Sequence, residues 1–124
     1  YGFQSLLETG GVQIVQPDVC NTGGISEARR IAALAEIHNL RVAPHNYGSS
    51  LATAVAVQAS AVMPNFMVLE VFPDHEDEAG YRPVLVEPLE SHLVGGVLQV
   101  PKGSGLGVSL DTGARAFRVG RVSV

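Results

Sequence analysis

The chain has 124 residues, of which 46% are hydrophobic and 16% are charged, and its formal net charge is −4 at pH 7. This composition excludes a disordered chain, and the acidic balance argues against a nucleic-acid partner. A single cysteine, Cys20, excludes an internal disulfide framework and suits the reducing cytoplasm, where we expect this protein to be located. The most apolar stretch, residues 51–63, is too short to cross a bilayer, so we expect no membrane partner.

The N-terminal part of the chain predicts the end of a helix and then a strand. Apolar residues at helical spacing predict a helix over residues 1–8, and the glycine pair at 10–11 is expected to end it. Because the chain begins with Tyr1 rather than methionine, we expect it to be part of a longer polypeptide. The apolar run over 12–16 predicts the first strand.

A loop over 19–25 leads into a second predicted helix over 27–38. Ser26 is suited to cap the N-terminus of this helix, and Asn39 is expected to end it. Its residues Ile31, Leu34, Ala35 and His38 fall on one stripe along the helix.

The pattern then repeats, with a strand over 40–43, a helix from about 49 to 63 and a strand over 66–69. The third helix is apolar on nearly all sides, so we expect it to be well buried. Strands that alternate with helices in this way are expected to be parallel neighbours in one sheet.

The sequence changes character after Glu70. Residues 74–78 form an acidic run that predicts a solvated loop, and short extended pieces joined by turns follow over 84–108. Asp111 is placed to cap a brief turn that extends through Arg115. We therefore divide the chain into a strand-and-helix section over 1–82 and a C-terminal extension over 83–124 that packs elsewhere.

Each of the three predicted strands is followed by a titratable side chain, which is Asp18, His45 or Glu70. The intervals are 27 and 25 residues, close to the roughly 31 residues of one strand-plus-helix unit in an eight-stranded α/β barrel. Such barrels carry their chemistry at the C-terminal ends of the strands. The sequence therefore predicts a site formed by these three residues on one face.

Asp18 and His45 are the residue types of a catalytic acid–base pair. An imidazole titrates near about pH 6.5, which suits a general acid or base, and a carboxylate on its far nitrogen would fix its tautomer. Read singly, each residue has a simpler role, since Asp18 could cap a loop, His45 could be a structural residue and Glu70 could be a solvated strand end.

Other polar residues give weaker signals. Gly23 and Gly24 precede a helix, but no Lys-Ser/Thr follows them, so we interpret them as a tight turn rather than a phosphate-binding loop. Cys20 has no adjacent base and is not predicted to be a nucleophile. Three further histidines lack metal-ligand spacing and are expected at the surface or at helix ends: His38, His75 and His92.

Five short motifs occur in a characteristic order: Gln16-Pro17-Asp18, Gly23-Gly24-Ile25-Ser26, Ala43-Pro44-His45-Asn46, Pro64-Asn65 with Leu69-Glu70, and Val100-Pro101 with Gly105-Leu106-Gly107-Val108. Together they resemble the C-terminal part of the mandelate racemase branch of the enolase superfamily over about residues 10–111. This resemblance implies an α/β fold in which the chain supplies about three βα units of a (β/α)₇β TIM-like barrel. These would be strands six to eight, followed by the tail that returns to a capping domain.

The resemblance also implies a chemistry. Members of this branch bind Mg²⁺ through carboxylates on the third to fifth strands and carry a lysine base on the second, so these groups are expected outside this chain. Of the family's functional positions, Asp18, His45 and Glu70 match and are the expected catalytic residues. No metal ligand is expected here, while Asn46 and Tyr47 are expected at the mouth as substrate-binding residues.

The implied reaction is abstraction of the proton α to a carboxylate through an enediolate that Mg²⁺ stabilises, with dehydration of a sugar acid as the favoured outcome. Racemisation, epimerisation and cycloisomerisation remain alternatives. The expected partners are a small carboxylate substrate, the missing N-terminal part of the same enzyme and, in the complete protein, further copies of it. The alternative of another class is a small non-catalytic α/β binding module, which would leave the strands over 12–16 and 66–69 as sheet edges.

Overall fold

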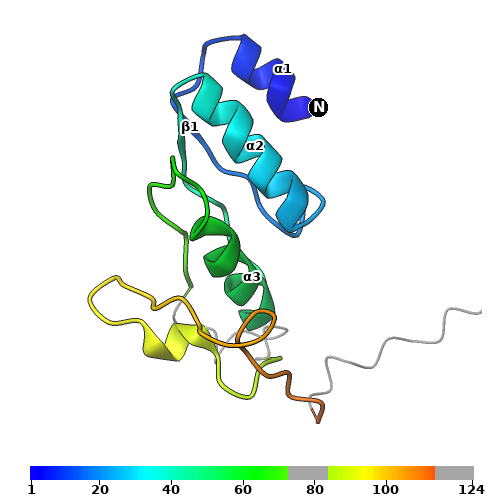
Figure 1. The fold of residues 1–124 in the computed structure, drawn as a ribbon, viewed down its shortest axis with the longest axis vertical. Coiled ribbons are helices and arrows are strands. Elements are labelled where there is room, and N and C mark those ends of the chain that lie inside the picture. Colours follow the sequence, from blue (N-terminus) through cyan, green and yellow to red (C-terminus); the bar gives the residue numbers. More distant parts are fainter. Residues whose placement is uncertain (73–83, 114–124) are drawn as a thin grey trace, which may run out of the picture.

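The computed structural model of the chain describes residues 1–72 and 84–113. Within these residues, three α-helices and two short strands follow one another in the predicted order, and a 3₁₀ helix lies in the tail (Figure 1). The elements are α1 (Gly2–Glu8), β1 (Ile14–Val15), α2 (Ile25–Ile37), β2 (Arg41–Val42), α3 (Ser50–Ser60) and η2 (Leu89–His92).

The two strands are parallel neighbours, as predicted. Ile14 pairs with Arg41 and Val15 pairs with Val42, and the N–H of Ala43 donates to the carbonyl of Val15 at 2.9 Å. The third predicted strand, over 66–69, is reduced to one parallel bridge between Val42 and Phe66. The sheet is therefore short, but the order of its three chain segments agrees with the prediction.

Helix α2 begins differently from the prediction. Its N-cap is Gly24 rather than Ser26, and Ser26 lies in the first turn of the helix. Gly23 and Gly24 have φ angles of 101° and 88°, in the region that residues with a Cβ rarely adopt, so the chain turns there before the helix starts. The expected tight turn at this glycine pair is confirmed, and it shifts the start of the helix toward the N-terminus.

The buried face of α2 coincides only in part with the stripe found in the sequence. Ile31 and Ala35 of that stripe are buried, and Ala28 and Ala32 are buried beside them. His38 is instead an exposed C-cap residue. Asn39 follows with a φ of 57° and ends the helix as predicted, since asparagine tolerates this left-handed conformation. Small alanine side chains on this face let α2 pack against both α1 and α3.

Helix α3 is buried on most of its surface, as its apolar sequence predicts. Ser49 is its N-cap, and the Ser49 hydroxyl accepts a hydrogen bond from the Ala52 N–H. The buried residues of α3 are Ser50, Ala52, Thr53, Ala54, Ala56, Val57, Ala59 and Ser60.

One hydrophobic core joins α1, both strands, α2 and α3. Its buried members are Leu7, Val15, Val19, Ala28, Ala32, Ala35, Val42, Ala56, Ala59 and Met63. Burial of these side chains is the main stabilising contribution to this part of the fold. Figure 1 shows α1 and α2 side by side at one end of the molecule, with α3 following toward the other end.

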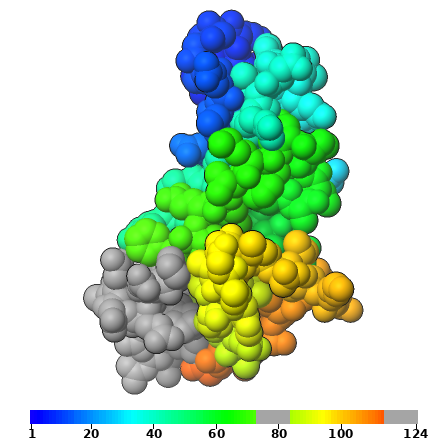
Figure 2. Space-filling model, turned by 90° about the vertical axis from the view of Figure 1, so that its left-hand side faces the viewer, coloured from blue at the N-terminus to red at the C-terminus, as the bar shows by residue number. Residues whose placement is uncertain are grey.

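The described part of the tail packs on α3, although we expected the tail to leave the strand-and-helix section. Leu85 and Leu89 form a second core with Ala54 and Val57 of α3. The Gln58 amide nitrogen also donates to two tail carbonyls, at 3.0 Å and 3.1 Å. Figure 2 shows the tail against the segment that contains α3.

The Asp111 turn is present, with the Asp111 carboxylate accepting from the Gly113 N–H at 2.9 Å. The rest of that predicted turn, the acidic run over 74–78 and the exact boundary at 82/83 lie outside the described residues. Within residues 1–72 and 84–113, no helix has the length and apolar character needed to span a membrane.

Apolar side chains are exposed at both outer segments of the sheet. Ile14 in β1 is 45% exposed, and Met67 and Val68 beyond the bridge at Phe66 are 53% and 54% exposed. None of these side chains has the charge that usually blunts a free sheet edge. This pattern is typical of segments that pair with further strands.

Candidate active site

Asp18 lies directly after the first strand segment and has two functions in the structure. Its Oδ1 accepts hydrogen bonds from the Cys20 N–H at 2.7 Å and the Asn21 N–H at 3.2 Å. These bonds cap the loop before α2, as the simpler interpretation of Asp18 predicts. Its other oxygen, Oδ2, is left to face the end of the next strand.

His45 lies at the end of the second strand segment and meets that oxygen. The His45 Nδ1 is 2.6 Å from Asp18 Oδ2, which confirms the carboxylate–imidazole hydrogen bond expected from the sequence. The Asp18 side chain is 13% exposed, whereas the His45 side chain is 46% exposed. Because an ionised Asp18 is an acceptor, Nδ1 is the ring nitrogen that donates its proton in this hydrogen bond.

The environment of Asp18 keeps it ionised. Burial by itself raises the pKa of Asp18, but the His45 hydrogen bond, the two backbone N–H donors and the charge of His45 together lower it below its ordinary value. The carboxylate therefore stays an acceptor for the imidazole over the physiological pH range.

Glu70 approaches the same imidazole from the other side. Its Oε2 lies 3.7 Å from His45 Nε2, and its side chain is 45% exposed. This distance is too long for a direct hydrogen bond, so the two groups face a shared space rather than bind each other. The structure thus brings all three sequence-predicted catalytic residues together at the C-terminal ends of the three strand segments.

The two expected substrate-binding residues differ from each other. Tyr47 is 50% exposed and packs edge-on against Phe72, with the ring centroids 4.9 Å apart. Asn46 is only 3% exposed, and its amide nitrogen donates to Thr53 Oγ1 and to the Glu70 carbonyl. The expectation that Asn46 faces the mouth is therefore wrong, because the backbone turns its side chain toward α3.

Thr53 is the residue near the site that the sequence interpretation missed. It lies in α3, is fully buried at 0% exposure and accepts the Asn46 hydrogen bond at 3.0 Å. The available signal was a hydroxyl in the middle of the apolar run from Leu51 to Val57.

Cys20 lies beside Asp18 without a catalytic arrangement. Burial, together with the negative charge of Asp18, raises the pKa of the Cys20 thiol and disfavours the reactive thiolate. Among the other histidines, His92 pairs with Glu87 at 2.9 Å on the surface of the tail, and His75 lies outside the described residues.

The described residues do not form a magnesium site. Residues 1–72 and 84–113 contain no group of three His, Cys, Asp or Glu side chains that could hold a metal ion. Asp18 and Glu70, the carboxylates at the sheet edge, are turned toward His45.

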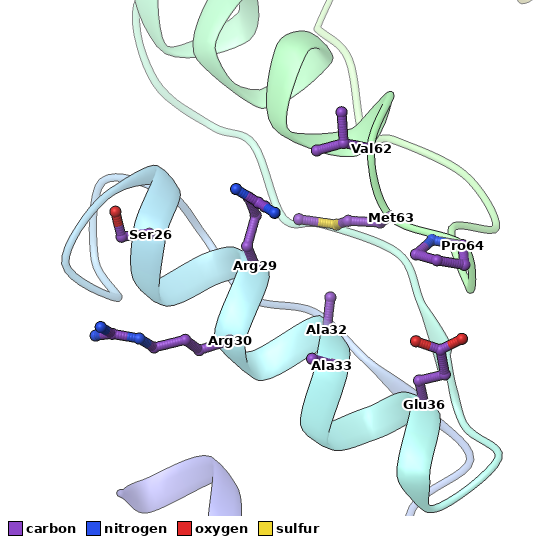
Figure 3. Close-up of a pocket in the computed structure, with 9 residues that line it drawn as sticks. All are labelled: Ser26, Arg29, Arg30, Ala32, Ala33, Glu36, Val62, Met63 and Pro64. Atoms are coloured by element: carbon purple, nitrogen blue, oxygen red, sulfur yellow. The ribbon is translucent and has the colours of Figure 1, made fainter.

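A hollow of about 550 Å³ lies elsewhere, between α2 and the end of α3 (Figure 3). It includes none of the three catalytic candidates and is lined by Ser26, Arg29, Arg30, Ala32, Ala33, Glu36, Val62, Met63 and Pro64. Helices α2 and α3 face each other across it, so it is a gap in the helical layer rather than part of the strand-end site.

Parallel strands separated by helices, with a carboxylate, an imidazole and a second carboxylate at their C-terminal ends, define a section of an α/β barrel with a strand-end site. Residues 1–114 match the family described as enolase C-terminal domain-like. The chain belongs to this family, within the mandelate racemase branch of the enolase superfamily.

The chain is similar to several characterised proteins. It is 40% identical over 120 residues to D-galactarolactone cycloisomerase of Agrobacterium fabrum, covering 92% of this chain and 31% of that protein. It is 37% identical over 115 residues to D-xylonate dehydratase of Haloferax volcanii, covering 92% and 27%. The solved structure of 3,6-anhydro-D-galactonate cycloisomerase from Zobellia galactanivorans superposes with a TM-score of 0.74 at 35% identity, covering 90% and 30%. The chain therefore spans less than a third of the length of these relatives.

Proposed function

We propose that this chain is the C-terminal barrel section of an enzyme that removes the proton α to the carboxylate of a sugar acid. The observation that carries the proposal is the Asp18–His45 hydrogen bond of 2.6 Å, which leaves His45 Nε2 on the side of Glu70, at 3.7 Å from its carboxylate. The names of the similar proteins support the substrate class, since two of them are a D-xylonate dehydratase and a D-galactarolactone cycloisomerase.

His45 performs the proton transfer in this proposal. With Nδ1 held by Asp18, the Nε2 accepts a proton from substrate or returns one to a departing group, and Asp18 stabilises the imidazolium that forms. Glu70, when it carries a proton, donates a hydrogen bond to a substrate carboxylate in the space between the two side chains. Each of these roles uses a side chain at the C-terminal end of one of the three strand segments.

Magnesium and a second base complete the proposal outside this chain. Bound Mg²⁺ would supply neutralisation of the charge that develops on the substrate carboxylate. The described residues hold no site for it, and the roles of Asp18, His45 and Glu70 require no metal ligand from this chain. In this proposal, the complete protein also contains the remaining strands of the barrel and a capping domain. It is located in the cytoplasm and forms a homo-oligomer.

Dehydration is the outcome we favour, because His45 could deliver the proton with which a β-hydroxyl leaves as water. Cycloisomerisation is the second candidate, and the 40% identity to D-galactarolactone cycloisomerase supports it. Racemisation or epimerisation would use the second base, outside this chain, on the face of the substrate opposite His45. A separate non-catalytic module is disfavoured by the family match over residues 1–114 and by the exposed apolar sheet edges.

The test uses the full-length protein, a panel of sugar acids and ²H₂O. NMR should show incorporation of deuterium at the substrate α-carbon or turnover, and His45→Asn should abolish both while the fold is retained. A dehydratase converts the acid into a 2-keto-3-deoxy product that carbonyl reagents detect, whereas a cycloisomerase gives a product of unchanged mass. Full turnover and exchange by His45→Asn would contradict the proposed role of the dyad formed by Asp18 and His45.

A further inference from the structure

Asn46 connects the end of the His45 strand segment to the end of the Glu70 segment. Its backbone N–H donates to Glu70 Oε2 at 3.1 Å, and its side-chain nitrogen donates to the Glu70 carbonyl at 3.1 Å. The Glu70 N–H in turn donates to the Pro44 carbonyl at 3.3 Å. Glu70 is therefore held at its N–H by Pro44 and at its carbonyl and its carboxylate by Asn46, the two residues that flank His45.

The second hydrogen of the Asn46 amide attaches this connection to helix α3. It donates to Thr53 Oγ1 at 3.0 Å, and Thr53 is fully buried in a helix that belongs to both hydrophobic cores. A primary amide has two N–H donors on one nitrogen, so it satisfies the Thr53 hydroxyl and the Glu70 carbonyl together. Serine or aspartate at this position lacks that pair of donors.

We propose that Asn46, anchored by Thr53, is a positioning residue that sets the distance between the Glu70 carboxylate and the His45 imidazole. The inference rests on the proposed function, because it assigns a role to Glu70 in the reaction. The oxygen that Asn46 N–H holds is Oε2, and the same oxygen lies 3.7 Å from His45 Nε2. A shift of the backbone at Asn46 therefore directly changes the distance between Glu70 Oε2 and His45 Nε2.

The burial of Asn46 separates this role from substrate binding. At 3% exposure its side chain does not reach the space that His45 and Glu70 face. Loss of Asn46 should consequently lower kcat, since misplacement of a reacting group by about 1 Å can cost on the order of 100-fold in rate. The change in KM should be the smaller effect, because only the hydrogen bond from Glu70 to the substrate shifts.

A matched pair of variants at Thr53 tests the anchor in the full-length enzyme. Thr53→Val keeps the shape of the side chain but removes the acceptor, and should lower kcat about 10- to 100-fold with KM changed less than about twofold. Thr53→Ser keeps the acceptor but removes a methyl group, and should keep kcat close to the wild-type value. If the role were packing alone, the order would be reversed, and that result overturns the proposal.

Ser50→Ala provides a control on the same helix. The Ser50 hydroxyl is buried and accepts a hydrogen bond from the Val84 N–H of the tail at 3.2 Å. Its removal should lower Tm without lowering kcat. A loss of kcat equal to that of Thr53→Val would mean that any buried hydroxyl of α3 affects turnover, which contradicts a specific role for Thr53.

A double-mutant cycle between Asn46 and Glu70 tests whether Asn46 acts through Glu70. Asn46→Ser should lower kcat in the wild-type background and change it less than about twofold in the Glu70→Ala background. Multiplicative losses overturn the positioning role while leaving the proposed function in place. Wild-type turnover by Glu70→Ala overturns the positioning role together with the role of Glu70, whereas wild-type turnover by His45→Asn overturns the proposed function itself. If Asn46→Ser does not fold, the Thr53 pair decides.

Discussion

Asp18→Asn removes the charge of the dyad while keeping its size and its contact with the loop. The asparagine oxygen can still accept from the backbone N–H groups of Cys20 and Asn21, which Asp18 Oδ1 accepts at 2.7 Å and 3.2 Å. At the position of Oδ2, however, the variant presents an NH₂ group to His45 Nδ1. Since two donors cannot share a hydrogen bond, Nδ1 must give up its proton and the proton moves to Nε2.

The magnitude follows from this exchange of tautomers. With Nε2 protonated, His45 can no longer accept a proton on the side that faces Glu70, and its imidazolium loses the carboxylate at 2.6 Å. General acid–base catalysis contributes about 10²–10⁴-fold, so kcat should fall by a factor in this range, or about 3–5 kcal/mol in activation free energy. The fold should be retained, because both loop hydrogen bonds have a replacement acceptor.

The assay combines kinetics with a direct readout of the tautomer. Steady-state kcat and α-proton exchange are measured in the full-length enzyme, and ¹⁵N NMR of the His45 ring reports which nitrogen is protonated. The losses of Asp18→Asn and His45→Asn should be far from multiplicative in the double variant, because the two residues act as a unit. Wild-type kcat with an unchanged ring tautomer in Asp18→Asn would refute the assignment of the dyad.

Three further predictions concern stability and the isolated chain. Ala56→Asp places a charge at a position that is 1% exposed and should destabilise the full-length protein by about 3–5 kcal/mol. As a control, Val62→Asp lies just beyond the same helix at 59% exposure and should change Tm little. Equal Tm values for the two variants would contradict the packing of α3. The folded-state pKa of Asp18 lies below its ordinary value of 3.8, so the stabilising contribution of Asp18 is complete above pH 3.8 and is lost as the pH falls through the folded-state pKa. Acid titration should therefore reduce the difference in unfolding free energy between the wild type and Asp18→Asn. A constant difference would argue against the ionised pair of Asp18 and His45. The isolated chain should show no turnover and no micromolar Mg²⁺ site by calorimetry, because its described residues contain no ligand cluster, and a tight site would overturn the placement of the metal outside this chain.

The positions of Asp18, His45 and Glu70 were predictable because strand ends are encoded locally. Each follows an apolar run, and the parallel order of the runs follows from the helices between them. The single hydrogen bond between Asp18 and His45 was also predictable, since neighbouring strands are about 4.8 Å apart and their ends lie within reach of two side chains.

The direction of Asn46 was not predictable in the same way. Alternation along an extended chain would place it opposite His45, but which neighbour it meets depends on where α3 and the Glu70 segment pack. The start of α2 at Gly24 depended on a backbone angle rather than on the capping preference of Ser26. Docking of the tail on α3 rests on long-range contacts of Gln58 that no local pattern encodes.

The pairing of Val15 with Val42 has a consequence for which sequence changes the site tolerates. Asp18 and His45 each lie three residues beyond these paired valines, so the two side chains are placed at equal distances along adjacent strands. Insertions or deletions in the segment between them, such as a longer turn after α2, leave that offset unchanged and should be compatible with the dyad. A single residue added between Val42 and His45 would displace the imidazole by about 3.3 Å and turn it to the opposite face. Length variation among related chains should therefore be frequent around α2 and absent from 15–18 and 42–45.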